Sequence, residues 1–379
     1  MRIALLTNGI FPFQIGGIQK HSYYLAKQLA NKGISVTVFC SDTGNSVNLN
    51  EYFSINELDH IEFQFFNFPA FFRFPGHYII SSYFFSKMIH EKIQEMNNFD
   101  WIYTQGFTSW YFLKNNPYQE NVITNLHGLE MFQKSSGLID FLRKLLLRTP
   151  AKQIIKNSNK QVSLGGKLSD ILYRQGAKDG SVVELPNGID DSWVLDESQL
   201  SERKDRKNRK RRFIFIGRYE RRKGIEEFQM IINDTIDNLT YEVLFIGPIP
   251  INKRISHPGV KYMGEIRDSN IIKDSLTSSD VLVSPSYSEG MPTVILEAMA
   301  RGCSIIATDV GANNTMVDEK NGWLIQGDIE KGLQQTLQKA VEVPDEKLYE
   351  MKKISVKRVK KNFTWEKVVD KMLKELRFV

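Results

Sequence analysis

Two carboxylates eight residues apart frame the segment with the clearest chemical content. Glu289 precedes a Gly-Met-Pro turn, and Glu297 lies inside an otherwise apolar run. Pro292 suits the first position of a helix, because the N–H that proline lacks is not needed there. The free amides of residues 290–294 would then point out of the edge of a sheet, where they suit a diphosphate or a developing negative charge.

Glu297 needs a partner, because an ionised carboxylate among apolar side chains is costly unless it is paired or hydrogen-bonded. The ribose diol of a ligand would satisfy it, and so would an arginine from elsewhere in the chain. The residues alone leave both partners open, so Glu297 is either a ligand contact or a structural acid.

A second group of charges lies in the segment GRYERRKG, residues 217–224. Arg218 follows a predicted strand, and Lys223 comes five residues later, near the start of a predicted helix. A planar guanidinium and an ammonium aimed at one loop can neutralise a diphosphate leaving group. Two solvent-exposed cations are an equally common outcome in a basic loop. Arg221 and Arg222, between them, are predicted to be the exposed pair.

Two glycines and a histidine follow strands that are predicted in the first half of the chain. Gly16 and Gly17 come after the first strand, where they allow close approach of a ligand or a positive φ, although a tight turn would also explain them. The third glycine of the dinucleotide signature is missing and no acid closes the second strand, so NAD is disfavoured. His127 closes another predicted strand and is either a structural residue or, from its place at a carboxyl strand end, a ligand contact.

Several motifs are absent from the sequence, and their absence narrows the chemistry. No Asp-x-Asp occurs, so the usual carboxylate pair for a nucleotide-bound divalent metal is missing, and we expect no metal. No G-x-x-x-x-G-K-[ST] and no G-x-S-x-G occurs either. These absences argue against a P-loop enzyme and against a hydrolase with a nucleophile elbow.

Short runs of Val, Ile and Leu alternate with helix-length segments along the sequence. Runs that are apolar on both faces are typical of parallel sheets covered by helices on both sides. The sequence therefore predicts an α/β fold with two doubly wound, Rossmann-like domains. The predicted strands cover residues 2–7, 34–40, 101–104, 121–126, 161–164, 181–186, 213–217, 242–247, 280–284, 304–308 and 322–325.

The bulk properties are those of a soluble globular protein with two domains. The chain has 379 residues and a net charge of +6. It has no apolar run close to the roughly 20 residues that span a bilayer, and its first residues have the pattern of a strand and not of a signal peptide. Cys40 and Cys303 lie far apart, so neither a disulfide framework nor a metal cluster is indicated, and we expect a cytoplasmic protein.

Three stretches depart from the alternating pattern. Residues 202–212 hold eight basic side chains and two acids, which favours a solvated linker between the domains; no nucleic-acid-binding motif accompanies them. Residues 141–156 hold five basic residues and leucines at near-helical spacing, which predicts either a core-facing helix or a helix lying on an anionic membrane surface. Residues 62–85 carry eleven Phe or Tyr. They are predicted to form either an irregular segment packed into the core or an aromatic surface that binds an acceptor.

Together these motifs resemble the retaining glycosyltransferases of family 4, which have the two-domain GT-B architecture. The resemblance spans nearly the whole chain in family order, and the acid–x7–acid motif with Gly-Met-Pro is specific in combination with G-R-x4-K-G. Met291 and Pro292 stand where many relatives have Phe-Gly. The segments that carry the resemblance are GGIQKHSYYLAKQLANKG, NLHGLE, the VSL of residues 162–164, LPNGID, FIGRYERRKG, SEGMPTVILEAMARG and FTWEKVV.

The resemblance implies the roles of residues at a donor site. Glu289 would contact hydroxyls of the donor sugar, and Glu297 would hold the ribose. Arg218 and Lys223 would neutralise the departing diphosphate, and His127 would reach the donor sugar. The further donor-binding positions are Gly16, Gly17, Gly290, Met291, Pro292 and Thr293.

The resemblance also implies a reaction and a domain arrangement. A hexosyl unit would pass from a nucleotide-diphosphate sugar, which we expect to be UDP-linked, to a glycan or lipid-linked saccharide, with retention and without metal or cofactor. Residues 1–197 would bind the acceptor and residues 198–363 the donor, facing across a cleft, while a helix of about 364–379 packs back on the first domain. The alternatives are another GT-B enzyme, such as a sugar-nucleotide epimerase, and a non-catalytic nucleotide-sugar-binding subunit. The expected setting is surface polysaccharide synthesis, in the cytoplasm or peripheral to the inner face of the membrane.

Overall fold

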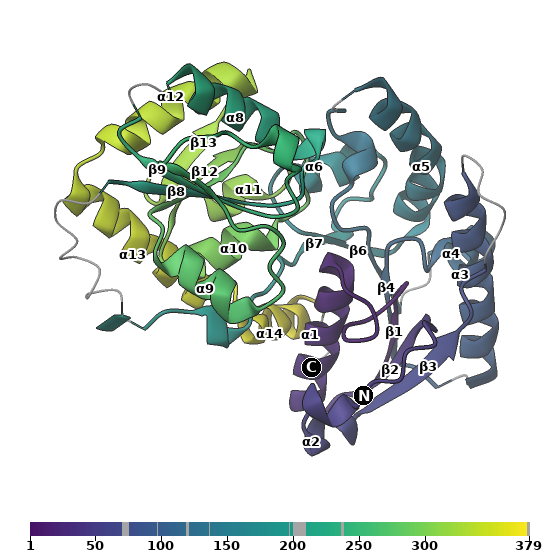
Figure 1. The fold of residues 1–379 in the computed structure, drawn as a ribbon. Helices are drawn as coiled ribbons and strands as arrows, with labels where there is room; N and C mark the ends of the chain where they lie inside the picture. The colour runs from purple at the N-terminus through teal and green to yellow at the C-terminus, as the bar shows by residue number, and fades with distance from the viewer. Residues whose placement is uncertain are drawn as a thin grey trace. The chain divides into compact units, whose positions relative to one another are not determined.

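The chain forms two compact units, each built on its own parallel sheet (Figure 1). A computed structural model describes residues 1–69, 76–96, 98–118, 121–135, 137–196, 198–199, 210–235 and 239–376. Unit 1 comprises Met1–Gln133, Leu138–Asn187 and Trp365–Val379, and unit 2 comprises Lys134–Gly137 and Gly188–Thr364. The α/β fold with two doubly wound parallel sheets, predicted from the sequence, is confirmed.

Unit 1 contains a seven-stranded sheet in the order β3-β2-β1-β4-β5-β6-β7, with every neighbouring pair parallel. The strand order reverses direction between β1 and β4, and ligands bind to doubly wound sheets outside the carboxyl ends of the strands at such a point. The strands are β1 (Arg2–Leu6), β2 (Ser35–Ser41), β3 (Ile61–Phe66), β4 (Trp101–Gln105), β5 (Val122–Asn125), β6 (Lys160–Ser163) and β7 (Val182–Glu184).

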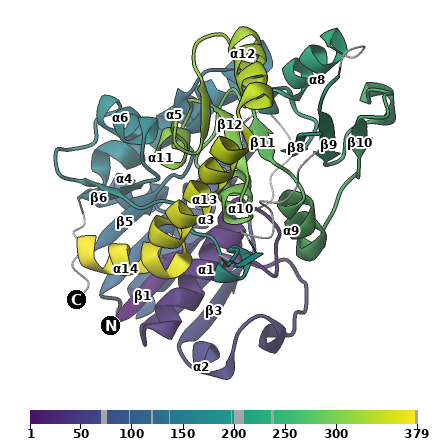
Figure 2. The same ribbon diagram turned by 90° about the vertical axis from the view of Figure 1, so that its left-hand side faces the viewer.

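The last helix of the chain completes the core of unit 1. Helix α14 lies against α1 (Figure 2). Trp365, at the start of α14, stacks on Tyr24 of α1 with ring centroids 5.7 Å apart, and Val368 and Met372 of α14 are buried with Leu25 of α1. The unit therefore needs both ends of its sequence to bury the outer face of α1. Its helices are α1 (Gly17–Asn31), α2 (Ile55–Leu58), α3 (His77–Met96), α4 (Trp110–Asn115), α5 (Leu138–Asn157), α6 (Lys167–Arg174) and α14 (Trp365–Glu375).

Unit 2 contains a six-stranded parallel sheet in the order β10-β9-β8-β11-β12-β13, which reverses direction between β8 and β11. The strands are β8 (Arg212–Ile216), β9 (Glu242–Ile246), β10 (Val260–Tyr262), β11 (Val281–Ser284), β12 (Ser304–Thr308) and β13 (Gly322–Ile325). The helices are α8 (Ile225–Asp234), α9 (Ser269–Thr277), α10 (Thr293–Ala300), α11 (Asn313–Met316), α12 (Ile329–Glu342) and α13 (Asp345–Asn362).

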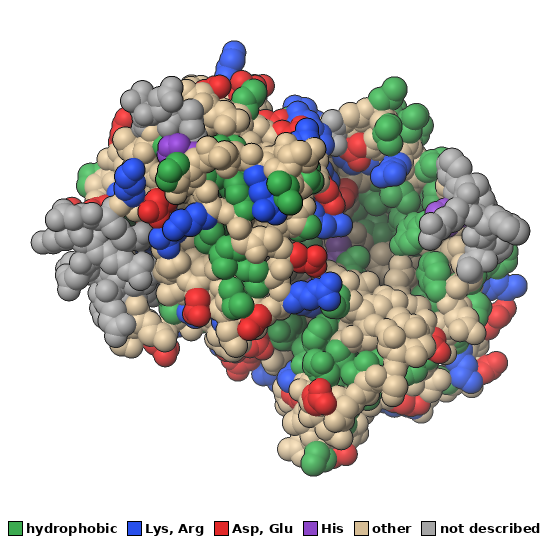
Figure 3. All heavy atoms as spheres, in the orientation of Figure 1, with side chains coloured by type: hydrophobic (Ala, Val, Ile, Leu, Met, Phe, Trp, Pro, Cys, Tyr) green, Lys and Arg blue, Asp and Glu red, His purple; other side chains and the backbone are tan. Residues whose placement is uncertain are grey.

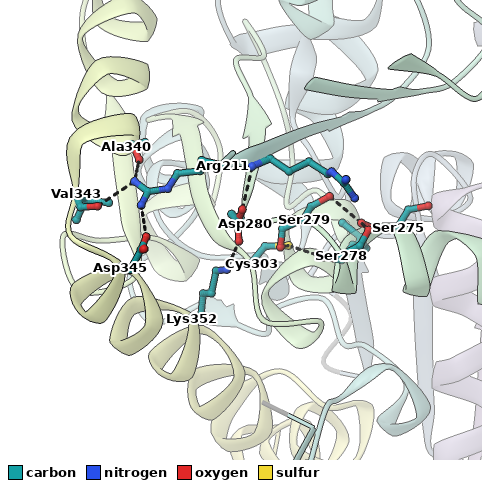
Figure 4. Close-up of polar contacts among 12 residues, drawn as sticks. Arg211, Ser275, Ser278, Ser279, Asp280, Cys303, Ala340, Val343, Asp345 and Lys352 are labelled. Carbon is teal, nitrogen blue, oxygen red and sulfur yellow. Dashed lines mark hydrogen bonds and ion pairs between the residues drawn. The ribbon is translucent and has the colours of Figure 1, made fainter. Parts of the chain in front are cut away.

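Buried charges fix α13 to the amino end of this sheet (Figure 4). Asp280, just before β11, pairs with Lys352 of α13 and accepts a hydrogen bond of 2.9 Å from the backbone N–H of Arg212. The Arg211 guanidinium pairs with Asp345 at 2.7 Å. The same guanidinium donates to the carbonyl oxygens of Ala340, Val341 and Val343 at 2.6–2.9 Å. These contacts hold α13, which in turn packs against α10.

All the strands predicted from apolar runs are present, and two further strands were missed. β3 lies at the start of the aromatic stretch 62–85, where Phe63 and Phe65 stack on one face of the strand. β10 has only three residues, too few for a visible pattern. The rest of the aromatic stretch includes residues 70–75, which lie outside the described residues.

The boundary between the units lies at Asn187–Gly188, ten residues before the predicted one. Residues 188–196 belong to unit 2 because the N–H of Leu195 donates to the carbonyl of Ala300 at 3.0 Å and its side chain packs against Val356. Most of the basic run falls on residues 200–209, outside the described residues. Within the described ranges, none of the helices is long and apolar enough to cross a bilayer.

Candidate functional site

The acid after β11 is held by two cations of the loop after β8. Glu289 is buried, and its carboxylate accepts a hydrogen bond from Lys223 Nζ at 2.6 Å. Arg222 Nη1 lies 3.6 Å from the other carboxylate oxygen. A buried carboxylate is costly without such partners, so these two cations offset the burial of Glu289 at the carboxyl edge of the sheet.

A glycine lets the loop of residues 217–224 reach the end of β11. Gly224 has a φ of 66°, in the left-handed region that favours glycine, and a β-carbon there would overlap the carbonyl oxygen of Pro285. The N–H of Tyr287 donates to the carbonyl of Arg222 at 2.8 Å, which joins the two loops a second time. Lys223 is thereby placed next to the turn that carries Glu289.

The prediction that Arg221 and Arg222 are the exposed cations is confirmed for Arg221, whose side chain is 45% exposed, and is wrong for Arg222. The Arg218 side chain is 69% exposed and pairs with Glu220 at 3.0 Å, whereas the Arg222 side chain is 22% exposed beside Glu289. Arg221 pairs with Glu227 and donates to the hydroxyl of Tyr287 at 2.8 Å. The sequence does not reveal these partners, because Tyr287 is 66 positions from Arg221 and Glu227, although six positions away, is one of several nearby acids.

Helix α10 begins directly after the Glu289 turn. Pro292 was predicted at the first position of the helix, but it is the N-cap residue, and the helix begins one residue later. The proline side chain cannot accept a hydrogen bond from the first amides of the helix. The exposed Thr293 opens the helix, and its first turn keeps amides that have no partner inside the helix. The positive end of the helix dipole adds to this anion-binding character.

Glu297 lies in the second turn of α10, as predicted, and is partly buried. Its neighbours Ile295, Leu296 and Ala298 are fully buried, so α10 packs against unit 2 through the helix faces on either side of Glu297. Glu297 itself lies on a partly exposed face of the helix. A residue in this position can meet both a protein group and a ligand.

The loop after β12 supports the Gly290 turn from the other side. The N–H of Ala312 donates to the carbonyl of Gly290 at 2.8 Å. Gly311 has a φ of 55°, and a β-carbon there would overlap the carbonyl oxygens of Glu289 and Gly290. Met291 is buried beneath the turn. The backbone of the turn is therefore fixed on both sides, which preorganises its amides.

In unit 1 the second residue after β5 adopts a constrained conformation. His127 has a φ of 57°, unusual for a residue other than glycine, and its N–H donates to Asn125 Oδ1 at 2.8 Å. Its Nε2 lies 2.9 Å from Gln105 Oε1, at the end of β4. Because an amide oxygen can only accept, we assign the ring proton to Nε2. Strained backbones of this kind concentrate at functional sites.

Burial around the ring lowers the pKa of His127 to about 4. The ring of His21, from α1, meets it edge-on with centroids 4.9 Å apart. Burial, and secondly the neighbouring His127, lowers the pKa of His21 well below its ordinary value. Both imidazoles are therefore neutral near pH 7, and His127 can offer a neutral ring to a ligand.

The glycine pair lies at the start of α1, at the carboxyl end of β1. Gly17 is the first residue of the helix, and a β-carbon there would meet no atom of the described chain within 4 Å. Gly16 is extended, with a φ of 168°. Neither glycine takes a left-handed φ, so the positive-φ interpretation does not apply to this pair.

The predicted residues thus fall into one group at the carboxyl edge of each sheet. Gly16, Gly17 and His127 belong to unit 1. In unit 2, Lys223 and Glu289 are in direct contact, whereas Arg218 points its charge to Glu220. Among the described residues, no group of three or more His, Cys, Asp or Glu side chains is placed to hold a metal ion.

Comparisons with known proteins agree with this architecture. The family model for Glycosyltransferase Family 4 matches residues 15–193, and the model for Glycosyl transferases group 1 matches residues 210–342. Sucrose-phosphate synthase from Thermosynechococcus elongatus superposes with a TM-score of 0.78 at 19% identity, over 100% of this chain and 98% of that one. At this identity the likeness shows the fold, which is GT-B.

Two curated relatives match parts of the chain. TuaC of Bacillus subtilis, assigned to teichuronic acid biosynthesis as a glycosyltransferase, is 30% identical over 183 residues, 46% of this chain and 45% of its own length. The UDP-Gal:alpha-D-GlcNAc-diphosphoundecaprenol alpha-1,3-galactosyltransferase of Escherichia coli is 37% identical over 106 residues, 27% of this chain and 26% of its own length. The chain thus covers less than half of each of these relatives.

Proposed function

The chain belongs to the family 4 glycosyltransferases, and we propose that it transfers a hexosyl unit from a nucleotide-diphosphate sugar to a glycan or glycolipid acceptor. In this proposal the donor is UDP-linked, the anomeric configuration is retained and no metal takes part. The name of the Escherichia coli relative, which specifies a UDP-sugar donor and a lipid-linked acceptor, supports this choice of substrates. We further propose that the product is a surface polysaccharide or glycolipid, made in the cytoplasm at the inner face of the membrane.

The observation that carries this proposal is the ion pair of Glu289 and Lys223 beside the first turn of α10. A sugar nucleotide presents sugar hydroxyls, which donate to a carboxylate, and a diphosphate, which accepts from an ammonium and from backbone amides. The pair and the turn offer these partners within one fixed stretch of backbone. We assign Glu289 to the sugar, Lys223 to the diphosphate and Glu297 to the ribose.

The remaining predicted residues complete the proposed roles. The exposed Arg218 exchanges Glu220 for the diphosphate when the donor binds. The amides of residues 290–293 stabilise the negative charge that develops on the leaving group, and this electrostatic term is the main contribution to catalysis. For unit 1, we assign contacts with the bound donor to the neutral ring of His127 and to the exposed backbone of Gly17, with Gly16 shaping the approach. The leaving phosphate takes the acceptor proton.

The proposal is tested by following nucleoside diphosphate release from a panel of sugar nucleotides, with and without candidate acceptors. Glu289→Gln and Lys223→Met are each expected to lower kcat/KM roughly 10²–10³-fold, because each removes one charged partner of the donor. Glu265→Gln, a change at an exposed acid of the same unit, serves as the matched control.

Four readouts decide between transfer and the alternatives. Product analysis by NMR is expected to show the donor's anomeric configuration retained, and full activity in EDTA is expected if no metal takes part. Isomerisation of the donor without an acceptor would point instead to an epimerase. Tight donor binding with no turnover on any acceptor, unchanged by Glu289→Gln, would favour a non-catalytic binding subunit.

A further inference from the structure

The amino-terminal half of α5 exposes an unusual concentration of apolar side chains. Six large apolar residues within nine positions are each between 42% and 75% exposed, in the described part of unit 1. Hydrophobic side chains gather on the surface over this end of α5 (Figure 3). They are Leu138, Ile139, Phe141, Leu142, Leu145 and Leu146. Single exposed hydrophobic residues are ordinary, but a contiguous group marks a surface that another apolar phase covers.

The rest of the helix shows why this exposure is not a packing defect. Ala151, Ile154 and Ile155, in the carboxyl-terminal half, are fully buried against unit 1. Trp110 of α4 donates to Gln153 at 2.7 Å, and Arg148 donates to the carbonyl of Met131 at 2.9 Å. The helix is therefore anchored by one half and presents the other half to its surroundings.

The exposed face changes from apolar to basic along the helix. Positions 138, 142, 145, 149, 152 and 156 follow one another at intervals of three and four, so they form one stripe, and all six are exposed. The stripe begins with three leucines and ends with Lys152 and Lys156. The helix carries five basic residues and one acid, Asp140, which pairs with Lys144 at 2.9 Å.

We propose that this face of α5, defined by Leu138, Leu142, Leu145, Leu146, Lys152 and Lys156, docks onto an anionic lipid bilayer. The apolar half inserts among the acyl chains near the headgroups, and the two lysines contact lipid phosphates. A second copy of the chain would also cover the leucines, but a contact between two leucine halves would not engage Lys152 and Lys156, whereas an anionic lipid surface complements both parts of the face. The proposal concerns a surface that the transfer reaction does not require, so the two can be tested apart.

The test is co-flotation of the full chain with vesicles that contain no acceptor lipid. Vesicles of phosphatidylcholine alone are compared with vesicles that also contain phosphatidylglycerol, at low and at high salt. The unmodified chain is expected to bind the anionic vesicles, and binding is expected to weaken as salt is added, because surface charge attraction is screened.

Two double variants separate the apolar and the electrostatic contributions to vesicle binding. Leu142→Ser with Leu145→Ser is expected to lower the partition coefficient at least tenfold, since both apolar side chains leave the interface. Lys152→Ala with Lys156→Ala is expected to lower it by about fivefold for each charge on anionic vesicles only. Ile55→Ser, at a 74% exposed position of α2, and Lys92→Ala, on α3, are matched controls that should bind like the unmodified chain.

The result that overturns the proposal is absence of vesicle binding, or equal binding by the leucine variant and the unmodified chain. If the unmodified chain did not bind vesicles but formed a dimer in light scattering, and the leucine variant were monomeric, the face would be assigned to a second copy instead. Circular dichroism confirms that each variant is folded. Activity on a water-soluble acceptor reports the transfer reaction separately, and both double variants should leave it unchanged.

Discussion

Replacement of Lys352 by methionine is expected to destabilise unit 2 strongly. The Lys352 and Asp280 side chains are 9% and 7% exposed and pair with each other (Figure 4). Methionine keeps the length of the side chain and removes its charge, so Asp280 would remain buried without its main cationic partner. Loss of one partner of a buried ion pair costs about 3–5 kcal/mol.

The structure places the expected cost near the lower end of that range. Asp280 keeps the hydrogen bond from the Arg212 N–H, which compensates part of its charge in the variant. We therefore expect about 3 kcal/mol, which corresponds to a fall in melting temperature of roughly 6–12 °C for a unit of this size. The double variant Lys352→Met with Asp280→Asn should lose less than the single variant, because it leaves no charge buried.

The assay is urea unfolding followed by circular dichroism, with hydrogen exchange of β11 and α13 peptides to report unit 2 separately. Lys353→Met is the matched control, because Lys353 is the next residue of α13, is half exposed and pairs with the exposed Glu350 on the helix surface. It should cost less than about 0.5 kcal/mol. The reasoning is refuted if Lys352→Met costs no more than Lys353→Met, or if the double variant is less stable than the single one.

Three further predictions concern the site and its support. Gly224→Ala should lower kcat/KM for transfer at least tenfold, because the added β-carbon overlaps the Pro285 carbonyl and displaces Lys223; an unchanged kcat/KM in steady-state kinetics would contradict this. Trp365→Ala should destabilise unit 1 by about 3–5 kcal/mol through the cavity it leaves over α1, measured by urea unfolding, and a loss below 1 kcal/mol would show that the helix contributes little. The stability of unit 1 should fall as the pH drops from about 6.5 to about 4, since the unfolded chain binds a proton that folded His127, with a pKa of about 4, does not. His127→Gln should flatten that part of the urea-midpoint profile, and an equally steep profile would refute the assignment.

The sequence was sufficient to predict the sheets and the order of the motifs. Parallel strands buried on both faces leave continuous apolar runs, so β1, β8 and β11 could be located from composition alone. β3 escaped because its aromatic residues continue into a longer aromatic stretch, which hides the end of the strand. β10 escaped because three residues carry too little periodicity.

The sequence was sufficient to predict that the candidate site residues follow the ends of strands, but not which side chains they contact. Lys223 and Glu289 are 66 positions apart, and which of four neighbouring cations meets the acid depends on the turn at Gly224. The positions of the other two arginines depend on nearby acids, because Arg218 pairs with Glu220 and Arg221 pairs with Glu227. Such pairings are decided by three-dimensional packing, and the sequence contains no separate pattern for them.

The return of α14 to unit 1 has a consequence for synthesis of the chain on the ribosome. Unit 2 is inserted in the sequence of unit 1, between Asn187 and Trp365. While residues 188–364 are being made, the nascent unit 1 exposes the face of α1 that Trp365 and Met372 later cover. Unit 2, apart from residues 134–137, is continuous and can fold as it emerges, so we expect the first-made unit to be completed last and to depend on chaperones in the interval.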